Sequence, residues 1–148
     1  MKLFADMDDA RQPDAVQFEL EEWIGIAPFE KLLGLKIESA ARGEALLTLP
    51  FKVKLANGGG VMHGGAMTAL ADTAVAMAIK SLLPRGTTFA TTGLTMEFIA
   101  PVVSGLVYAR AQVKSTGGRS FEGSCELHSE GHQLYARFTS VFKAARQR

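Results

Sequence analysis

The spacing of apolar residues changes along this chain, and each change marks a different kind of element. Between residues 45 and 51, every second residue is apolar, so one face of the segment is apolar. This alternation predicts a β-strand. Most residues from Ala66 to Ile79 are Ala, Met, Leu, Ile or Val, which predicts a helix from about Gly65 to Leu83 that is buried on all sides. Strand-like alternation returns in four further segments, at 88–100, 105–116, 119–129 and 133–143.

The part before residue 45 predicts shorter elements. Helical spacing runs over Ala15–Trp23, a short helix follows Pro28 and ends at Gly34, and a strand covers Leu35–Ala41. We therefore expect a leader with a short helix at residues 1–26 and one domain at residues 27–148. Two strands, one apolar helix and four strands predict an α+β fold, in which a single antiparallel sheet curls around the helix.

Charge and composition exclude several classes of protein. Residues 1–25 carry two basic and seven acidic side chains, a net charge of −5, which leaves +6 on the rest of a chain whose formal net charge is +1. This mildly basic remainder suits a small anionic ligand but is too weak for a nucleic-acid surface. Asp72 and Lys80 interrupt the apolar helix, so no membrane span is expected, and without a signal peptide the expected location is cytoplasmic.

Metal and disulfide chemistry are not expected. Cys125 is the one cysteine of the chain, which excludes an internal disulfide and a redox pair of cysteines. The three histidines, His63, His128 and His132, lack the spacing of zinc ligands. We expect no metal and no cofactor.

The most informative stretch is NGGGVMHGGAMTALAD, residues 57–72, where a glycine-rich turn leads into the apolar helix. Asp72 is the sole acidic residue between Glu44 and Glu97. A carboxylate on an apolar helix costs several kcal/mol unless it is paired or used in chemistry. A structural aspartate bonded to a neighbouring strand and a catalytic one are equally compatible with the sequence at this point.

Several features of the sequence together indicate a known family. They are the segments PFEKLLGLKI and GEALLTLP, the pattern Asn57-x-x-Gly60-x-x-His63-Gly64-Gly65, Asp72 on the helix, and the later segment FIAP. The chain resembles the hotdog-fold acyl-CoA thioesterases of the phenylacetic-acid pathway, the PaaI-like type, from about Pro28 to Phe142. The resemblance implies a sheet wrapped around a helix, hydrolysis of an acyl-CoA thioester, and a homodimer usually paired into a homotetramer.

The resemblance also assigns catalytic roles. It implies that the carbonyl oxygen of the thioester meets the helix N-terminus, where the Gly64 N–H, with or without that of Gly65, forms an oxyanion hole; the unpaired first N–H groups and the helix dipole support this independently. Asp72 would be a general base or a nucleophile. Asn57 would orient water or the thioester, and Thr91, or alternatively Thr92, would position water. We further expect Asp72 and Thr91 to come from different subunits of a dimer.

Substrate contacts are expected from four residues around the motif. His63 would fix the turn through backbone hydrogen bonds and touch the substrate, and Gly65 would let the ligand approach the backbone. Met62 would line an adaptable acyl pocket. Arg119 would bind coenzyme A phosphates, with Arg85, Lys80 and Lys114 as less specific candidates.

Two other functions stay open. A hydratase or dehydratase on the same fold places its histidine and acid differently from His63 and Asp72, and a non-catalytic acyl-CoA-binding module is compatible with the same fold. A serine hydrolase is not expected, because the chain has no G-x-S-x-G sequence. The acyl group could be aryl, arylacetyl or medium-chain, and the thioester could be carried by coenzyme A or by a carrier protein.

Overall fold

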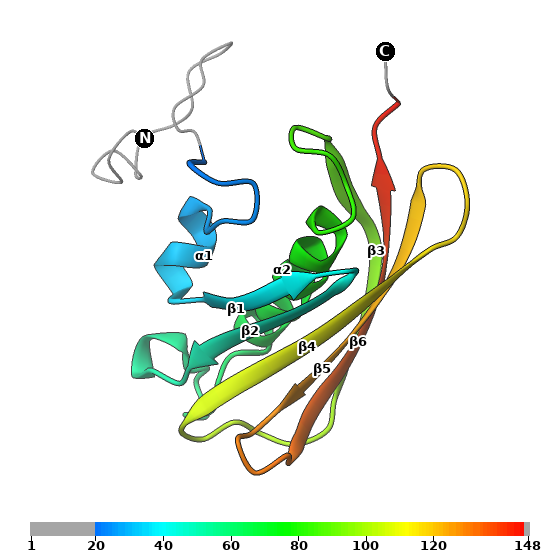
Figure 1. Ribbon diagram of the computed structural model, residues 1–148. Helices are drawn as coiled ribbons and strands as arrows, with labels where there is room; N and C mark the ends of the chain where they lie inside the picture. Colours follow the sequence, from blue (N-terminus) through cyan, green and yellow to red (C-terminus); the bar gives the residue numbers. More distant parts are fainter. Residues whose placement is uncertain (1–19, 147–148) are drawn as a thin grey trace.

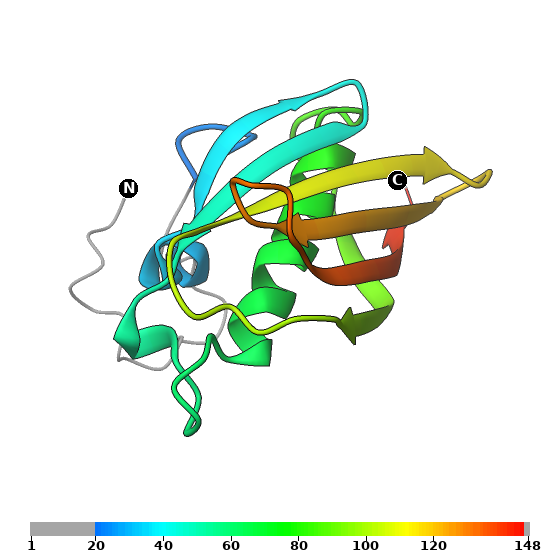
Figure 2. The ribbon, with the colours of Figure 1, turned by 90° about the horizontal axis from the view of Figure 1, so that it is seen from below.

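One long helix lies against one face of a six-stranded antiparallel sheet in the computed structural model, which describes residues 20–146 (Figure 1). Seen from below, the strands form a single layer that crosses the helix (Figure 2). The sequence prediction of a sheet wrapped around an apolar helix is therefore confirmed. The elements, in chain order, are α1 (Pro28–Leu33), β1 (Lys36–Ala41), β2 (Glu44–Pro50), the 3₁₀ helix η2 (Val53–Leu55), α2 (Gly64–Lys80), β3 (Phe89–Phe98), β4 (Leu106–Ser115), β5 (Ser120–His128) and β6 (Leu134–Ala144).

The strand order is β1-β2-β4-β5-β6-β3, so β3 lies at one edge of the sheet beside β6. Hairpins β1–β2, β4–β5 and β5–β6 join neighbours, whereas the chain between β2 and β4 passes through α2 and β3. Among the described residues, strand β3 pairs with β6 alone, and most of its side chains are exposed. A ten-residue edge strand of this kind is a surface on which another chain can pair.

Small side chains let α2 approach the sheet closely. Leu70, Ala71, Ala74 and Val75 of α2 have no exposed surface, and they pack on the inward-facing residues of the sheet. At Gly123 in β5, an added Cβ would lie 2.3 Å from Cγ1 of Val75, so no larger residue fits without moving the helix. The absence of a side chain at Gly123 thus sets how near α2 lies to the sheet.

Two helices differ from the sequence prediction. Helix α2 ends at Lys80 rather than Leu83. The proline at position 84 disfavours the helical conformation of the preceding residue, and the N–H of Leu82 closes the last turn by bonding the Ile79 carbonyl. The predicted helix over Ala15–Trp23 lies mainly outside the described residues, and residues 20–23 are not helical.

Candidate active site

Asp72 projects from the middle of α2 toward β3. The Thr91 hydroxyl of β3 donates a hydrogen bond of 2.8 Å to Oδ1 of Asp72. Burial among apolar side chains raises the pKa of Asp72 above its ordinary value, and the Thr91 hydrogen bond opposes this shift. A carboxylate of raised pKa is a stronger base than a solvated one, which suits it to accept a proton.

The pairing of Asp72 with Thr91 depends on an irregularity in β3. The register of β3 against β6 shifts between Thr91 and Gly93, so Thr91 faces the helix. Thr92 is exposed and donates instead to the Val141 carbonyl at 3.2 Å. Thr91, rather than Thr92, thus lies at Asp72. The expectation that Asp72 and Thr91 come from different subunits is wrong, because a single chain brings them within hydrogen-bond distance.

The N-terminus of α2 is organised by His63. Its Nδ1 accepts a hydrogen bond of 2.8 Å from the Gly65 N–H, which makes His63 the N-cap of the helix. The Gly65 N–H therefore already has an acceptor within the chain. Within residues 20–146, no acceptor pairs with the Gly64 N–H, which leaves this group as the open donor at the helix start.

Asn57 closes the turn that leads into α2. Its Oδ1 accepts hydrogen bonds from the backbone N–H groups of Gly59 at 2.9 Å and Val61 at 3.3 Å. Its own N–H bonds the Val61 carbonyl at 2.8 Å. The side-chain oxygen is thus committed to the turn, and the Nδ2 group is the part of Asn57 that can face a ligand.

The predicted catalytic residues divide between two hollows. The Asp72 hollow, about 420 Å³, is lined by Asp72 and Thr91 together with Trp23, Phe29, Phe89 and Phe142. The Gly64 hollow, about 400 Å³, is lined by Gly64, Asn57 and Met62 together with Phe98 and Pro101.

The two hollows have no lining residue in common. Gly64 and Asp72 lie eight residues apart on α2, which is about 12 Å along the helix axis. One chain therefore does not bring Gly64 and Asp72 against a single thioester carbonyl.

Each basic residue considered for coenzyme A binding either donates a hydrogen bond to a backbone carbonyl or lies outside the two hollows. Arg119 donates to the Ala144 carbonyl at 3.0 Å and lines neither hollow, while Arg85 donates to the Glu21 carbonyl at 3.2 Å. Lys114 lines a separate depression on the sheet. Lys80 does line the Asp72 hollow, together with Trp23. The sequence did not indicate Trp23 as a site residue, because no local pattern pairs it with Lys80.

No group of three or more His, Cys, Asp or Glu among the described residues is placed to hold a metal ion. None of the helices in residues 20–146 has the length and apolarity that crossing a membrane requires.

Comparisons with known proteins place this geometry in a family. The sequence model of the thioesterase superfamily matches residues 59–136, which include the turn, α2 and most of the sheet. A candidate esterase of Halobacterium salinarum is 37% identical over 90 residues, which span 57% of this chain and 59% of that protein. The acyl-coenzyme A thioesterase PaaI of Escherichia coli is 31% identical over 109 residues, 73% of this chain and 76% of PaaI.

Solved structures agree with this assignment. A conserved protein of Pseudomonas aeruginosa superposes with a TM-score of 0.79 at 31% identity, covering 84% of this chain and 98% of that one. The E. coli PaaI structure, from the phenylacetic acid degradation operon, gives a TM-score of 0.74 at 28% identity, covering 81% of this chain and 86% of PaaI. The chain therefore belongs to the thioesterase superfamily, as a PaaI-like hotdog-fold thioesterase.

Proposed function

We propose that this chain hydrolyses acyl-CoA thioesters, with Asp72 as the general base and the Gly64 N–H as the oxyanion donor. The observation that carries the proposal is Asp72 itself, a half-buried carboxylate on an apolar helix that lines a hollow and is oriented by Thr91. A structural aspartate would need no opening beside it. The acyl-CoA specificity of the PaaI relative supports the choice of substrate.

The chemistry needs few groups. Asp72 removes a proton from water, and the resulting hydroxide attacks the thioester carbonyl carbon. The negative charge that develops on the carbonyl oxygen is stabilised by the Gly64 N–H and the positive end of the α2 dipole, a contribution of about 3–4 kcal/mol for one such donor. The C–S bond then breaks, and the thiolate leaves and takes the proton from Asp72. The products are the free acid and free coenzyme A, and Asp72 is regenerated.

The site is completed by a second copy of the chain. Because Gly64 and Asp72 line separate hollows, we propose that each active site combines Asp72 and Thr91 of one subunit with Gly64 and Asn57 of the other. The free edge of β3 offers the contact: it carries the exposed apolar side chains Leu94 and Phe98, followed by Ile99. A two-fold axis at this edge sets the two α2 helices antiparallel, so the start of one faces the middle of the other.

Lesser roles follow from the same arrangement. The Nδ2 group of Asn57 would hold the thioester or the attacking water, and Met62 would adapt to the group beside Gly64. We propose that Arg119 reaches coenzyme A phosphates only after releasing the Ala144 carbonyl. A dimer that pairs again into a tetramer and a cytoplasmic location are parts of the proposal, and the single buried thiol of Cys125 accords with a reducing compartment.

The function is tested by measuring thiol release from a panel of aryl, arylacetyl and straight-chain acyl-CoAs. Hydrolysis frees one thiol per acid formed, and we expect this result. Consumption of an enoyl double bond without thiol would identify a hydratase instead. Saturable binding without either reaction would identify a binding module. The same panel on pantetheine thioesters of a carrier protein would separate the two sources of thioester.

The shared site is tested by mixing two inactive variants, Asp72→Asn and Gly64→Val. A mixed dimer then holds one doubly damaged site and one intact site. Random exchange should restore about a quarter of wild-type activity, since half of the dimers are mixed and each has one working site. No recovery, with subunit exchange verified by mass spectrometry of tagged chains, would place both groups in one subunit.

A further inference from the structure

Residues 20–26, here called the strap, cross the C-terminal end of α2 and are tied to it. The Trp23 indole N–H donates to the Lys80 carbonyl at 2.9 Å, and the Lys80 ammonium donates back to the Trp23 carbonyl at 3.0 Å. The same ammonium lies 4.7 Å from the centroid of the indole ring. The Phe89 ring meets the indole edge-on at 6.4 Å. The indole is therefore held in one place by contacts from two directions.

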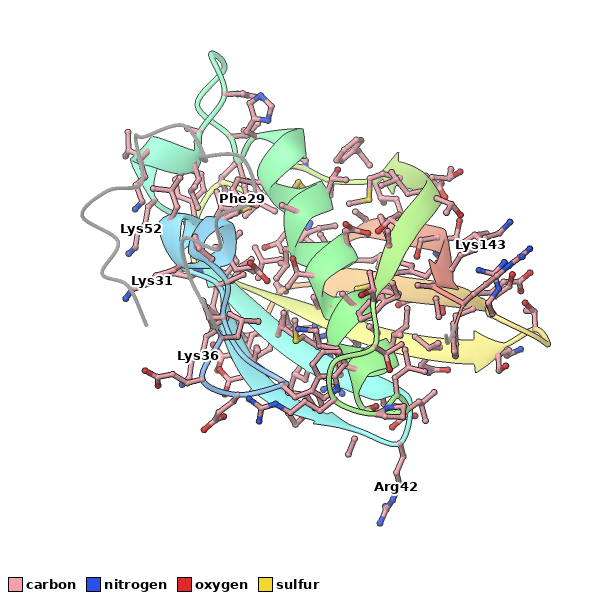
Figure 3. The ribbon with its side chains drawn as sticks, turned by 90° about the horizontal axis from the view of Figure 1, so that it is seen from above. Phe29, Lys31, Lys36, Arg42, Lys52 and Lys143 are labelled. Carbon is pink, nitrogen blue, oxygen red and sulfur yellow. The ribbon has the colours of Figure 1, made fainter. Side chains whose placement is uncertain are left out.

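The Trp23–Lys80 pair also forms one end of the Asp72 hollow. Asp72, Ala76 and Lys80 follow each other at intervals of four residues on one face of α2, so the hollow extends about 12 Å along the helix. Its lining combines the aromatic rings of Phe89, from β3, and Phe29, which projects from α1 beside α2 (Figure 3), with the polar side chains of Glu30, Thr73, Thr87 and Thr88. The hollow is thus a slot with the carboxylate at one end and the Trp23–Lys80 pair at the other.

We propose that Trp23 and Lys80 close the distal end of the acyl slot and set the length of the longest acyl group that the enzyme accepts. The inference rests on the proposed function, in which the thioester carbonyl lies near Asp72 and the acyl group extends away from it. An acyl group longer than the slot must displace the indole. That displacement breaks the hydrogen bond from the indole N–H and leaves the Lys80 carbonyl, near the helix end, with the longer bond of 3.4 Å from the Leu83 N–H.

The same contacts would also hold a strap whose sole task is to cap the helix. The two roles differ in how activity depends on the substrate. A cap affects all acyl groups equally, whereas a slot end discriminates by length. Each methylene that fits should raise kcat/KM roughly fourfold, and the gain should stop where the chain meets the indole.

The deciding measurement is kcat/KM for butanoyl-, hexanoyl-, octanoyl- and decanoyl-CoA with Trp23→Ala, using Trp23→Phe as the matched control. Trp23→Ala should move the preferred length upward, with a gain of roughly tenfold or more for the next longer acyl group relative to the wild-type optimum. Trp23→Phe loses the indole hydrogen bond but keeps a ring at the slot end, so its preferred length should stay that of wild type. A uniform loss at every length in Trp23→Ala would overturn the proposal.

A second variant acts inside the slot and does not disturb the strap. Ala76 lies between Asp72 and Lys80 and lines the hollow, so Ala76→Leu should shorten the preferred acyl length. An unchanged profile in this variant would place the acyl group elsewhere and contradict the proposal. Ala76→Leu therefore gives an answer even if Trp23→Ala fails to fold.

Binding of acyl-CoA thioether analogues, which cannot be hydrolysed, separates this proposal from the proposed function. If the wild-type chain releases no thiol from any acyl-CoA, the proposed function fails, yet affinity for the analogues should still peak at one length and shift in Trp23→Ala. If hydrolysis occurs and neither the kinetic nor the binding profile shifts, the slot end alone is wrong. Absence of binding by every analogue would overturn both.

Discussion

The two hollows on α2 belong to one helix but differ in how their polar groups are satisfied. At the Gly64 hollow, the polar atoms of the turn bond one another. His63 accepts a hydrogen bond from the Gly65 N–H, and Asn57 accepts hydrogen bonds from two further backbone N–H groups. At the start of α2, the Gly64 N–H has no acceptor among the described residues. At the Asp72 hollow, the Asp72 carboxylate has a raised pKa, and its one hydrogen-bond partner within residues 20–146 is the Thr91 hydroxyl. In the proposed mechanism, the first region is a backbone site for the substrate oxygen, and the second is the proton acceptor.

This difference predicts that substitutions at the Asp72 hollow change the reactive group alone. Substitutions at the Gly64 hollow should change the packing of side chains as well. Replacing Asp72 removes a titrating group and little volume. Replacing Gly64 adds a Cβ only 3.0 Å from the ring of Phe98, so packing must adjust. Four substitutions test the comparison.

Asp72→Asn should have the largest effect, a fall in kcat of roughly two orders of magnitude or more, because the base is lost while the shape is kept. Circular dichroism should show an unchanged fold. The raised pKa means that the folded state binds the proton more tightly than the unfolded state, so wild-type stability falls as pH rises from about 3.8 through the folded pKa. The variant should lack this fall and be at least as stable at neutral pH. Near wild-type turnover would refute the role of Asp72.

Gly64→Ala should lower kcat by about tenfold or more, because the added methyl group stands between the Gly64 N–H and the substrate oxygen. The matched control is Gly58→Ala in the same turn, where an added Cβ meets nothing within 4 Å and activity should be retained. Affinity for a thioether analogue should be measured beside the rate. Equal losses of affinity and rate would indicate obstruction rather than a lost oxyanion contact.

Thr91→Val should lower kcat by roughly tenfold, because the carboxylate loses the hydrogen bond that orients it. Since that bond holds the pKa of Asp72 down, the acidic limb of the pH–rate profile should move to higher pH. Thr92→Val serves as the control, since its hydroxyl is exposed and bonds the Val141 carbonyl. An unshifted profile in Thr91→Val would show that Asp72 is not the group that titrates in catalysis.

His63→Ala should have the smallest effect on turnover and act chiefly on stability. Loss of the N-cap should cost about 1 kcal/mol in the free energy of unfolding, measured by urea denaturation. His63→Asn, which can also cap the helix, should recover most of this loss. A large fall in kcat that Asn does not repair would instead give His63 a direct contact with the substrate.

The sequence predicts the sheet and α2 well because their patterns are local. Alternation of apolar residues, interrupted at glycine or proline, marks β4, β5 and β6 within one or two residues. Asp72 and the turn at Asn57 could be named from their neighbours alone. Thr91 was harder, because the shift of register between Thr91 and Gly93 decides which threonine faces the helix, and no local pattern reveals it.

What the sequence could not predict depends on contacts between distant parts of the chain. The hydrogen bonds between Trp23 and Lys80 join residues that are 57 positions apart. The helical spacing around Trp23 predicted an amphipathic helix, yet the bonds to α2 hold residues 20–23 in an irregular conformation. The division of the site between two hollows likewise appears only when α2 and β3 are placed together.

Gly123 carries no functional group and lines neither the Asp72 nor the Gly64 hollow, yet it constrains the position of the proposed catalytic residues. A side chain there would press on Val75, one turn from Asp72, and lift α2 from the sheet. The 2.8 Å distance between Asp72 and Thr91 would lengthen, although neither residue had changed. Engineers who diversify this enzyme for new thioesters should therefore leave Gly123 fixed, and loss-of-function alleles should arise there as readily as at residues that touch the substrate.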